Sequence, residues 1–435
     1  MAEIHPFRGT RYNQARLADL WRVICPPYDI ISPRQQEELY ARHEYNFVRL
    51  ELGRELPQDR VGENRYTRAA STLRRWLAEG VLITEDTPAI YLHDHHFQMD
   101  GRQHCRRSFF ARVRLEEWGA GIVRPHEGTL PGPRRDRLDL LWALEANTSP
   151  ILAMYEDPKG WISELLRAEA GRSPLISIED DDQRHELWRI THPEVIASIA
   201  ATLADRPLYI ADGHHRYTSA LTYRRERRTY SSPPPSGEQP YDFTLMSLVD
   251  MADPGLVILA PHRLVRGIAR PLLEQLIPKL ESFFNLETVP ATEDAWPHVD
   301  TLAARQTRVC LACYGPGGDN ILVLTLRPET NVTPLMPSFH APLFRELDVS
   351  IADHVILEKL LGIDPGGDED RVHYTHERDE AIRRVRDGEY QLAFFLRPIS
   401  PALVKAVADA GEKMPRKSTY FYPKTPVGLV FYRFS

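Results

Sequence analysis

The feature that most limits how this chain of 435 residues can fold is one proline-rich stretch near its middle, Ser231–Pro240. Four of its ten residues are proline, and the others are serine, glycine, glutamate and glutamine. Because proline lacks a backbone N–H and fixes φ, this stretch can form neither a helix nor an inner strand. We predict a loop or a linker here. At roughly 150 residues per domain, two or three domains are expected.

The charge balance and composition are those of a soluble globular protein. Lys and Arg number 54 against 61 Asp and Glu, a formal net charge of −7, which disfavours a dedicated binder of duplex DNA. No apolar run reaches the roughly 18 residues of a spanning helix, and the first residues lack the features of a secretory signal. Four cysteines are too few for a disulfide scaffold. We expect a cytoplasmic protein with neither a membrane nor a nucleic acid as partner.

Hydrophobic periodicity predicts helices and strands in mixed order on both sides of the linker. Helical spacing is found at 66–79, 193–204, 271–284 and 350–361. Strands are predicted at 89–93, 106–115, 243–250, 309–314 and 321–326. The fold class is therefore α+β, or mixed α/β, in two or more domains.

A strand that runs into a polar turn is the strongest functional pattern. The apolar run 208–211 predicts a short buried strand, and helical spacing then begins at His214. The strand is followed by Asp212, by Gly213 for a tight turn, and by three polar residues of the first helical turn, His214, His215 and Arg216. A helix N-terminus offers N–H groups and about half a positive charge, so cationic side chains there form an anion site suited to phosphate. A merely capped helix start predicts Ser or Asp followed by Glu instead.

The second candidate is an acidic side chain in a turn. Glu127 lies between Pro125 and Gly128, beside His126 and close to Arg124. A carboxylate in such a turn can act as a general base. From the spacing alone, an exposed loop carboxylate without a chemical role explains the pattern better.

Three further patterns are better explained by structure than by chemistry. Cys310 and Cys313 form a C-x-x-C pair within a predicted strand, with no second pair for a zinc site and no helix to activate a thiolate. The acidic run 179–182 lacks the ligand spacing of a calcium loop. The glycines of 315–320 are not followed by the Lys-Ser/Thr of a P-loop. No metal-ligand set is predicted.

Nearly the whole chain resembles a bacterial and archaeal family long labelled a domain of unknown function and loosely called ParB-like. The stretches that carry the resemblance are His5–Gly9, Pro26–Asp29, Tyr45–Leu50, Asn147–Ile151, Asp212–Arg216 and Met414–Phe421. The family label itself implies no activity.

The middle of the chain, 122–225, is similar to the ParB/sulfiredoxin-like superfamily and, among its members, to the free serine kinases. Those kinases carry a His-Glu turn and then a strand that runs into Asp-Gly-His-His-Arg, which here are His126-Glu127 and Asp212–Arg216. A long segment, 151–190, lies between the two motifs and departs from the kinases. The resemblance implies an N-terminal α+β part over 1–120, a nucleotide-binding core over 121–230, the linker over 231–240 and a C-terminal α+β part over 241–435.

The resemblance also implies roles for individual residues. In the kinases the Glu takes the proton of the serine hydroxyl, and the turn binds the nucleotide phosphates. Glu127 is then the base, and Asp212 positions the turn or holds Mg²⁺ through water. With ATP or ADP as donor, the implied nucleotide-binding residues are His126, Gly213, His214, His215 and Arg216, of which His214 is also counted as catalytic.

The expected function is phosphoryl transfer from a nucleotide to the hydroxyl of free L-serine, which gives O-phospho-L-serine. Sulfiredoxin chemistry is excluded because it needs a cysteine where this chain has His214. No helix-turn-helix module of a ParB protein is found. Two alternatives stay open, a non-catalytic nucleotide-binding protein and a nucleotide hydrolase. Glu127 discriminates between them, because a binding protein needs no base.

Overall fold

The fold is that of a computed structural model of the chain, which describes residues 2–180, 182–231, 236–292, 294–306, 308–337, 342–368 and 370–434. These residues form two compact units. The first unit contains the residues before His126, Thr129–Val257 and the residues after Tyr422. The second contains His126–Gly128 and Ile258–Tyr422.

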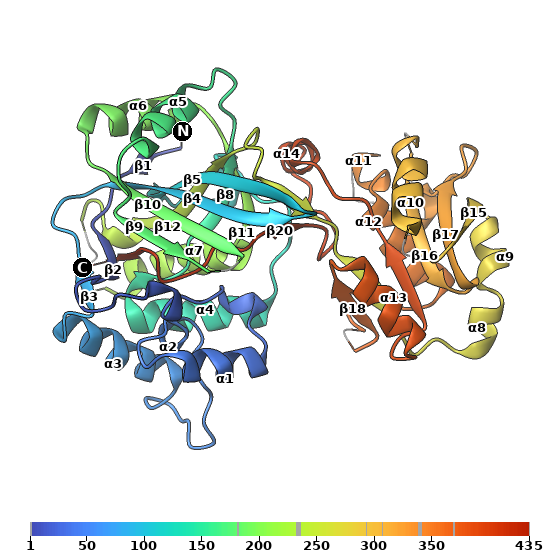
Figure 1. Cartoon of the computed structure of the whole chain (residues 1–435), viewed down its shortest axis with the longest axis horizontal. Helices are drawn as coiled ribbons and strands as arrows, with labels where there is room; N and C mark the ends of the chain where they lie inside the picture. Colours follow the sequence, from blue (N-terminus) through green and yellow to red (C-terminus); the bar gives the residue numbers. More distant parts are fainter. Residues whose placement is uncertain are drawn as a thin grey trace. The chain divides into compact units, whose positions relative to one another are not determined.

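A nine-stranded sheet forms the centre of the first unit (Figure 1). Its strands lie in the order β6 (Val123–Arg124), β11 (Leu208–Asp212), β8 (Ile151–Tyr155), β12 (Phe243–Asp250), β5 (Arg102–Arg114), β4 (Ile90–Met99), β10 (Gln183–Ile190) and β9 (Ile176–Glu179), and β1 (Ile4–His5) also pairs with β5. The pairs β6–β11 and β8–β12 are parallel, and the others are antiparallel. All five residues of β8 are apolar and buried, as expected for an inner strand covered on both faces.

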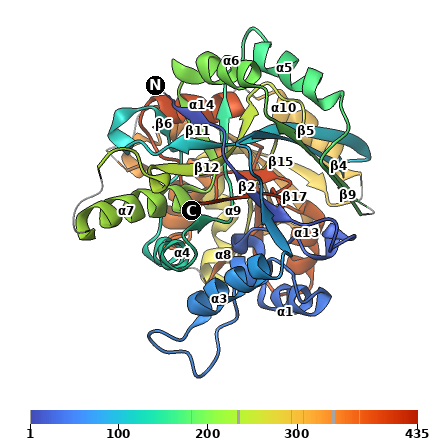
Figure 2. The same cartoon turned by 90° about the vertical axis from the view of Figure 1, so that its left-hand side faces the viewer.

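Helices cover both faces of this sheet. Figures 1 and 2 show α5 (Trp161–Ala170) and α6 (Pro193–Ala204) on one face, and α3 (Arg65–Ala78) and α4 (Pro131–Leu144) on the other. The unit also contains α1 (Pro33–Arg42), α2 (Val48–Glu51), α7 (His214–Tyr230) and the 3₁₀ helices η1 (Leu20–Arg22), η2 (Tyr28–Ile30), η3 (Trp118–Ala120) and η4 (Pro240–Asp242). A four-stranded sheet has the order β3 (Leu82–Thr84), β2 (Gly9–Tyr12), β21 (Phe431–Arg433) and β7 (Ala146–Asn147).

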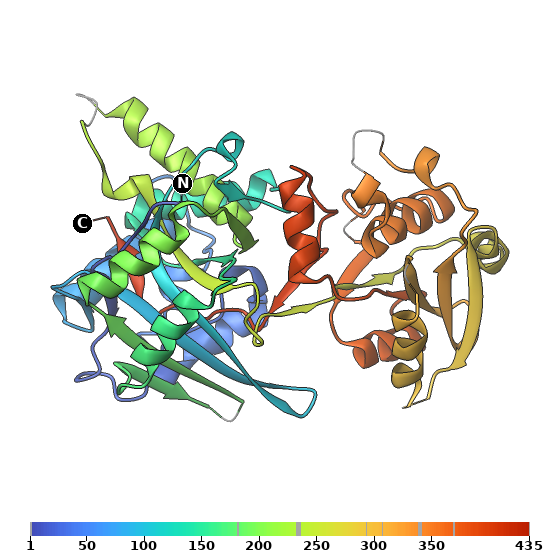
Figure 3. The same cartoon turned by 90° about the horizontal axis from the view of Figure 1, so that it is seen from above.

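The longest strands, β4 and β5, form the hairpin that the sequence predicts. Figure 3 shows it as two blue strands joined by a tight turn. The turn residues Asp100 and Gly101 have φ of 50° and 70°, the left-handed pair that a two-residue hairpin requires. Both strands extend further toward the turn than predicted, because their outer halves are polar and carry little hydrophobic signal.

The second unit is built on a six-stranded sheet. Its order is β15 (Phe284–Pro290), β17 (Gly318–Leu326), β16 (Cys310–Gly315), β19 (Leu392–Phe395), β14 (His262–Val265) and β18 (Val372–Thr375), and a two-stranded sheet pairs β13 (Val257–Leu259) with β20 (Tyr420–Tyr422). Its helices are α8 (Arg270–Glu274), α9 (Leu276–Glu281), α10 (Ala295–Ala304), η5 (Thr333–Leu335), α11 (Pro342–Arg345), α12 (Asp348–Ser350), the π-helix η6 (Ile351–Leu360), α13 (Arg378–Arg386) and α14 (Pro401–Asp409). The two C-x-x-C cysteines lie buried in β16, as expected for core cysteines.

The mixed α/β class is confirmed, but the units divide the chain differently from the predicted domains. β12 follows the proline-rich linker and nevertheless pairs with β5 and β8, so segments from 1–120, 121–230 and 241–435 share one sheet. The boundary falls between Val257 and Ile258. A linker marks where the chain turns, whereas strand pairing decides which unit a segment joins. Residues 232–235 of the linker, and residue 181 of the acidic run, lie outside the described residues.

Within the described ranges, no helix is both long enough and apolar enough to cross a bilayer.

Candidate functional site

The strand-to-helix junction at Asp212–Arg216 depends on one glycine. β11 ends at Asp212 and α7 begins at His214, at the positions that the apolar run and the helical spacing predict. Gly213 has φ +101°, a left-handed conformation that favours glycine. A Cβ here would lie 3.0 Å from Nε of Arg216 and 3.2 Å from Cγ1 of Ile151. Glycine is therefore needed both for the turn and for the space that the Arg216 side chain occupies.

Two cations hold the carboxylate of Asp212. Arg216 donates to Oδ2 of Asp212 and to the carbonyl of Pro150, and Lys424 donates to Oδ1 of Asp212. The side chains of Asp212, Arg216 and Lys424 are only 17%, 10% and 11% exposed. Burial alone would raise the pKa of Asp212, but the charges of Lys424 and Arg216 outweigh it and hold that pKa well below its usual range. One ionised carboxylate thus faces two cations, which leaves this group of three charges positive.

The two histidines of the turn lie at the positive end of α7. His214 is buried and His215 is half-buried. The first α-helical hydrogen bond runs from the N–H of Tyr217 to the carbonyl of Gly213, at 2.9 Å. His214 and His215 therefore occupy the first turn, as the sequence predicts. That they bind a nucleotide stays a prediction.

The candidate base Glu127 and its neighbour His126 belong to the second unit. The N–H of Met414 donates to the carbonyl of His126 at 2.8 Å, and Oγ1 of Thr419 lies 3.0 Å from Nε2 of His126. The same hydroxyl donates to Oε1 of Glu127 at 3.4 Å. The His-Glu turn is thus held by Met414–Phe421, one of the stretches that carry the family resemblance. The structure brings Asp212–Arg216 together in one unit and places His126 and Glu127 in the other.

A second buried polar cluster in the first unit is centred on Glu51, which is fully buried. Its carboxylate accepts from Nη1 of Arg137 at 3.1 Å, from Oγ1 of Thr148 at 2.8 Å, and from Oγ of Ser149. The Arg137 guanidinium also lies over the ring of Tyr28, 3.8 Å from its centroid. This cluster joins three more of the stretches that carry the family resemblance. Tyr28 lies in Pro26–Asp29, Thr148 and Ser149 lie in Asn147–Ile151, and Glu51 directly follows Tyr45–Leu50.

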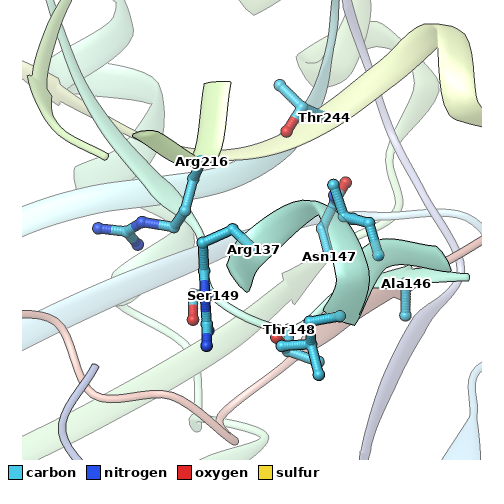
Figure 4. Close-up of a pocket in the computed structure, with 9 residues that line it drawn as sticks. Arg137, Ala146, Asn147, Thr148, Ser149, Arg216 and Thr244 are labelled. Atoms are coloured by element: carbon cyan, nitrogen blue, oxygen red, sulfur yellow. The ribbon is translucent and has the colours of Figure 1, made fainter. Parts of the chain in front are cut away.

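A small pocket lies between this cluster and the junction (Figure 4). Two arginines, Arg137 and Arg216, line it together with Leu140, Leu141, Ala146, Asn147, Thr148, Ser149 and Thr244. It has about 30 Å³ of room for water-sized groups, enough for one or two waters. A guanidinium has five N–H donors, so Arg216 can donate to a further acceptor beyond Asp212 and Pro150.

A buried arginine fixes the segment that carries Lys424. Arg106 is 1% exposed and donates to the carbonyl of Pro423 at 2.9 Å and to Oγ1 of Thr425 at 3.0 Å. Burial lowers the pKa of Arg106 to about 10, although the charges of two aspartates act in the opposite direction. Lys424 is therefore anchored through both of its chain neighbours.

Sequence reasoning missed Lys424, Glu51, Arg137 and Arg106. A signal existed for two of them, since Glu51 directly follows Tyr45–Leu50 and Lys424 comes three residues after Phe421. For the two arginines there was none, because burial of a cation depends on distant partners and leaves no local pattern.

Comparison with known proteins gives one family and several solved structures. The family described as a protein of unknown function (DUF1015) matches residues 4–350. No curated protein matches the sequence. A free serine kinase variant in complex with AMP aligns over 74% of this chain and 92% of its own, at 12% identity and a TM-score of 0.36.

Two further structures are similar at the same level. A conserved hypothetical protein from Pyrococcus furiosus aligns over 74% of this chain and 95% of its own, at 14% identity and a TM-score of 0.34. SbnI from Staphylococcus aureus, with a C-terminal truncation, aligns over 73% and 84%, at 12% identity and a TM-score of 0.34. At these values the similarity allows no conclusion about activity.

Proposed function

This chain belongs to the family of unknown function DUF1015, and we propose that it is a phosphotransferase that moves a phosphoryl group from ATP or ADP to the hydroxyl of free L-serine, giving O-phospho-L-serine. In this proposal the nucleotide phosphates bind at the N-terminus of α7.

The observation that carries the proposal is the positive junction after β11. Arg216 and Lys424 surround a single ionised carboxylate, and His214 and His215 stand in the first turn of α7. Catalysis of phosphoryl transfer depends mainly on fixed positive charge around the transferred group. Because Asp212 and the carbonyl of Pro150 hold Arg216 in place, little reorganisation is needed when an anion arrives.

Glu127 is the base in this proposal. This role rests on the resemblance of His126-Glu127 to the His-Glu turn of the free serine kinases. The hydroxyl of Thr419 donates to the carboxylate of Glu127 and orients it. Glu127 would accept the serine hydroxyl proton as the oxygen attacks the terminal phosphorus of the nucleotide, and the nucleotide would leave with one phosphoryl group fewer.

The residues of the junction do not fit a directly bound Mg²⁺. Two cationic side chains, Arg216 and Lys424, already bind the single carboxylate of Asp212, and the net positive charge of these three groups would repel a further cation. Of the two roles considered for Asp212, positioning the turn is therefore the better supported. In the proposal, Arg216 and Lys424 neutralise phosphate charge, and any Mg²⁺ is held by the nucleotide itself.

A nucleotide-binding protein without catalysis is the second candidate. It is favoured by one observation: the positively charged groups all lie in the first unit and need no residue of the second unit to bind an anion. Under this alternative Glu127 is dispensable.

The test incubates the purified protein with ATP or ADP, Mg²⁺ and a panel of amino acids, and detects products by mass spectrometry. Phosphoserine formed only when L-serine is present, and lost in Glu127→Gln but not in the exposed control Glu164→Gln, supports the kinase. Nucleotide binding without product supports the second candidate. Glu127-dependent nucleotide hydrolysis without serine supports a hydrolase. A protein that neither binds nor converts nucleotides refutes the proposal.

A further inference from the structure

One face of the β4–β5 hairpin brings three different metal-ligand types together. His96 pairs directly with Cys105 across the hairpin, and Asp94 lies two residues from His96 on the same face of β4. One ligand atom from each of the three, a carboxylate oxygen, an imidazole nitrogen and Sγ, all lie within 4.8 Å of one another. Nε2 of His96 is 3.9 Å from Sγ of Cys105. The proposed phosphotransferase uses none of these side chains.

The neighbouring strand adds a fourth donor. Glu186 of β10 pairs with Asp94, and its Oε2 lies 3.1 Å from Nε2 of His96. The His96 side chain is 25% exposed, whereas that of Asp94 is 4% exposed. An ion could therefore enter from the solvent beside His96 and meet a buried carboxylate below it.

Two arginines border the cluster, and their positions decide whether a cation is tolerated. Arg107 donates from Nε to one oxygen of Asp94 at 2.8 Å and from Nη2 to the other at 2.5 Å. Nη2 of Arg184 lies 3.4 Å from Nε2 of His96. A carboxylate has about four lone-pair sites, so Arg107 leaves room on Asp94 for an ion. Such hydrogen bonds to a liganding carboxylate are common around bound metals and orient it. The carboxylates of Asp94 and Glu186 balance the two guanidinium charges.

We propose that Asp94, His96 and Cys105 bind a divalent transition-metal ion of the Zn²⁺ class, with Glu186 beside the remaining position. A mixed set of nitrogen, sulfur and oxygen donors suits Zn²⁺ and its neighbours, whereas Mg²⁺ and Ca²⁺ take oxygen donors. Bonds of roughly 2.0–2.3 Å place the ligands of a tetrahedral site somewhat under 4 Å apart, which the His96–Cys105 separation already matches closely. On binding, the Cys105 thiol loses its proton to solvent and its sulfur forms the metal bond, with no change of oxidation state.

This site is independent of the phosphotransferase proposal. The spacing of its ligand residues along the sequence does not predict it. Asp94 and His96 come from one strand and Cys105 from the next, so only the hairpin register joins them.

Co²⁺ is the probe for the first test, because its absorption reports both geometry and thiolate ligation. The full-length protein should bind one equivalent, with tetrahedral d–d bands and a thiolate-to-cobalt charge-transfer band, and Zn²⁺ should displace it. Cys105→Ser should abolish the charge-transfer band. Removing a residue that hydrogen-bonds to a metal ligand typically weakens metal affinity 10- to 100-fold. His96→Gln removes a ligand itself, so it should weaken Co²⁺ affinity by about 100-fold or more. His104→Gln is the matched control, because His104 is next to Cys105 in β5 and stacks on Phe97 instead.

A second measurement does not depend on variants that fold. Cys105 is the one cysteine that is not buried, so a thiol reagent added to the native protein reports on Cys105. Saturating Zn²⁺ should slow this modification strongly. The proposal is overturned if the wild-type protein shows no saturable Co²⁺ spectrum, if Zn²⁺ leaves the thiol reaction unchanged, or if folded Cys105→Ser keeps the charge-transfer band.

Discussion

Replacing Gly213 by alanine should reveal how tightly the junction holds Arg216. Two costs add at this position. A left-handed conformation costs a non-glycine residue about 1–2 kcal/mol, and Gly213 has φ +101°. The new Cβ would also lie 3.0 Å from Nε of Arg216 and 3.2 Å from Ile151, so the guanidinium must move and weaken its bonds to Asp212 and Pro150. Hydrogen bonds to charged groups contribute about 1.5–3 kcal/mol, which brings the expected loss of stability to about 2.5–5 kcal/mol.

A matched glycine separates the two costs. Gly62 has a similar φ of +87°, but a Cβ there meets nothing within 4 Å. Gly62→Ala should therefore show the conformational cost alone. Because the chain has two units, a single unfolding transition cannot be assumed, and hydrogen exchange of the amides of β11 and α7 is the better measure of local stability.

A double variant tests the cause directly. If Gly213→Ala acts by displacing Arg216, then Arg216→Ala should add little to it, and the two effects should be clearly less than additive. The reasoning is refuted if Gly213→Ala costs no more than Gly62→Ala, or if the two changes at the junction are additive.

Three other predictions concern the charges of the junction and the candidate base. Lys424→Met should lower stability at pH 7 by about 1–3 kcal/mol. Because the pKa of Asp212 is depressed in the folded state, this loss relative to wild type should be full above the unfolded-state pKa of about 3.9 and should shrink as the pH falls below it. Urea titrations across pH 3–7 measure this loss, and the exposed control Lys413→Met should show neither effect. Arg216→Ala should weaken nucleotide binding by about 1.5–3 kcal/mol in calorimetry, and Arg216→Lys should not restore it, because the fork geometry is lost; unchanged affinity in both would exclude the junction as the phosphate site. Glu127→Gln should lower kcat about 10²–10⁴-fold with nucleotide affinity within about 1 kcal/mol of wild type, and a wild-type rate of serine phosphorylation would remove Glu127 as the base.

The parts of the fold that the sequence predicts are those whose cause is local. The apolar run before Asp212, the glycine at 213 and the helical spacing after it are neighbours in the chain, and the structure shows β11, a left-handed glycine and α7 there. The hairpin of β16 and β17 follows from two apolar strands around a glycine-rich turn in the same way. Such patterns need no information about the rest of the molecule.

The assignment of segments to units could not be predicted, because it depends on partners. β12 is buried along nearly its whole length, and its sequence would suit an inner strand in either unit. Its place between β5 and β8 is decided by which strands have an open edge, a property of the assembled sheet. The proline-rich stretch before it is therefore a sound predictor of a loop and a poor predictor of a unit boundary.

The same distinction explains which half of the junction was foreseen. A largely buried carboxylate is costly unless cations pair with it. Arg216 supplies one from the next helical turn, four residues away, so the sequence motif contains it. Lys424 supplies the other from 212 positions away, and Arg106 on β5 fixes it by binding Pro423 and Thr425. The ion pair requires only that the ammonium group reach Oδ1 of Asp212 in space. It does not limit how far from Asp212 the second cation lies in the sequence. A buried acidic residue with one cation nearby in the sequence therefore predicts that a remote polar segment also pairs with its carboxylate. The sequence alone does not identify that segment.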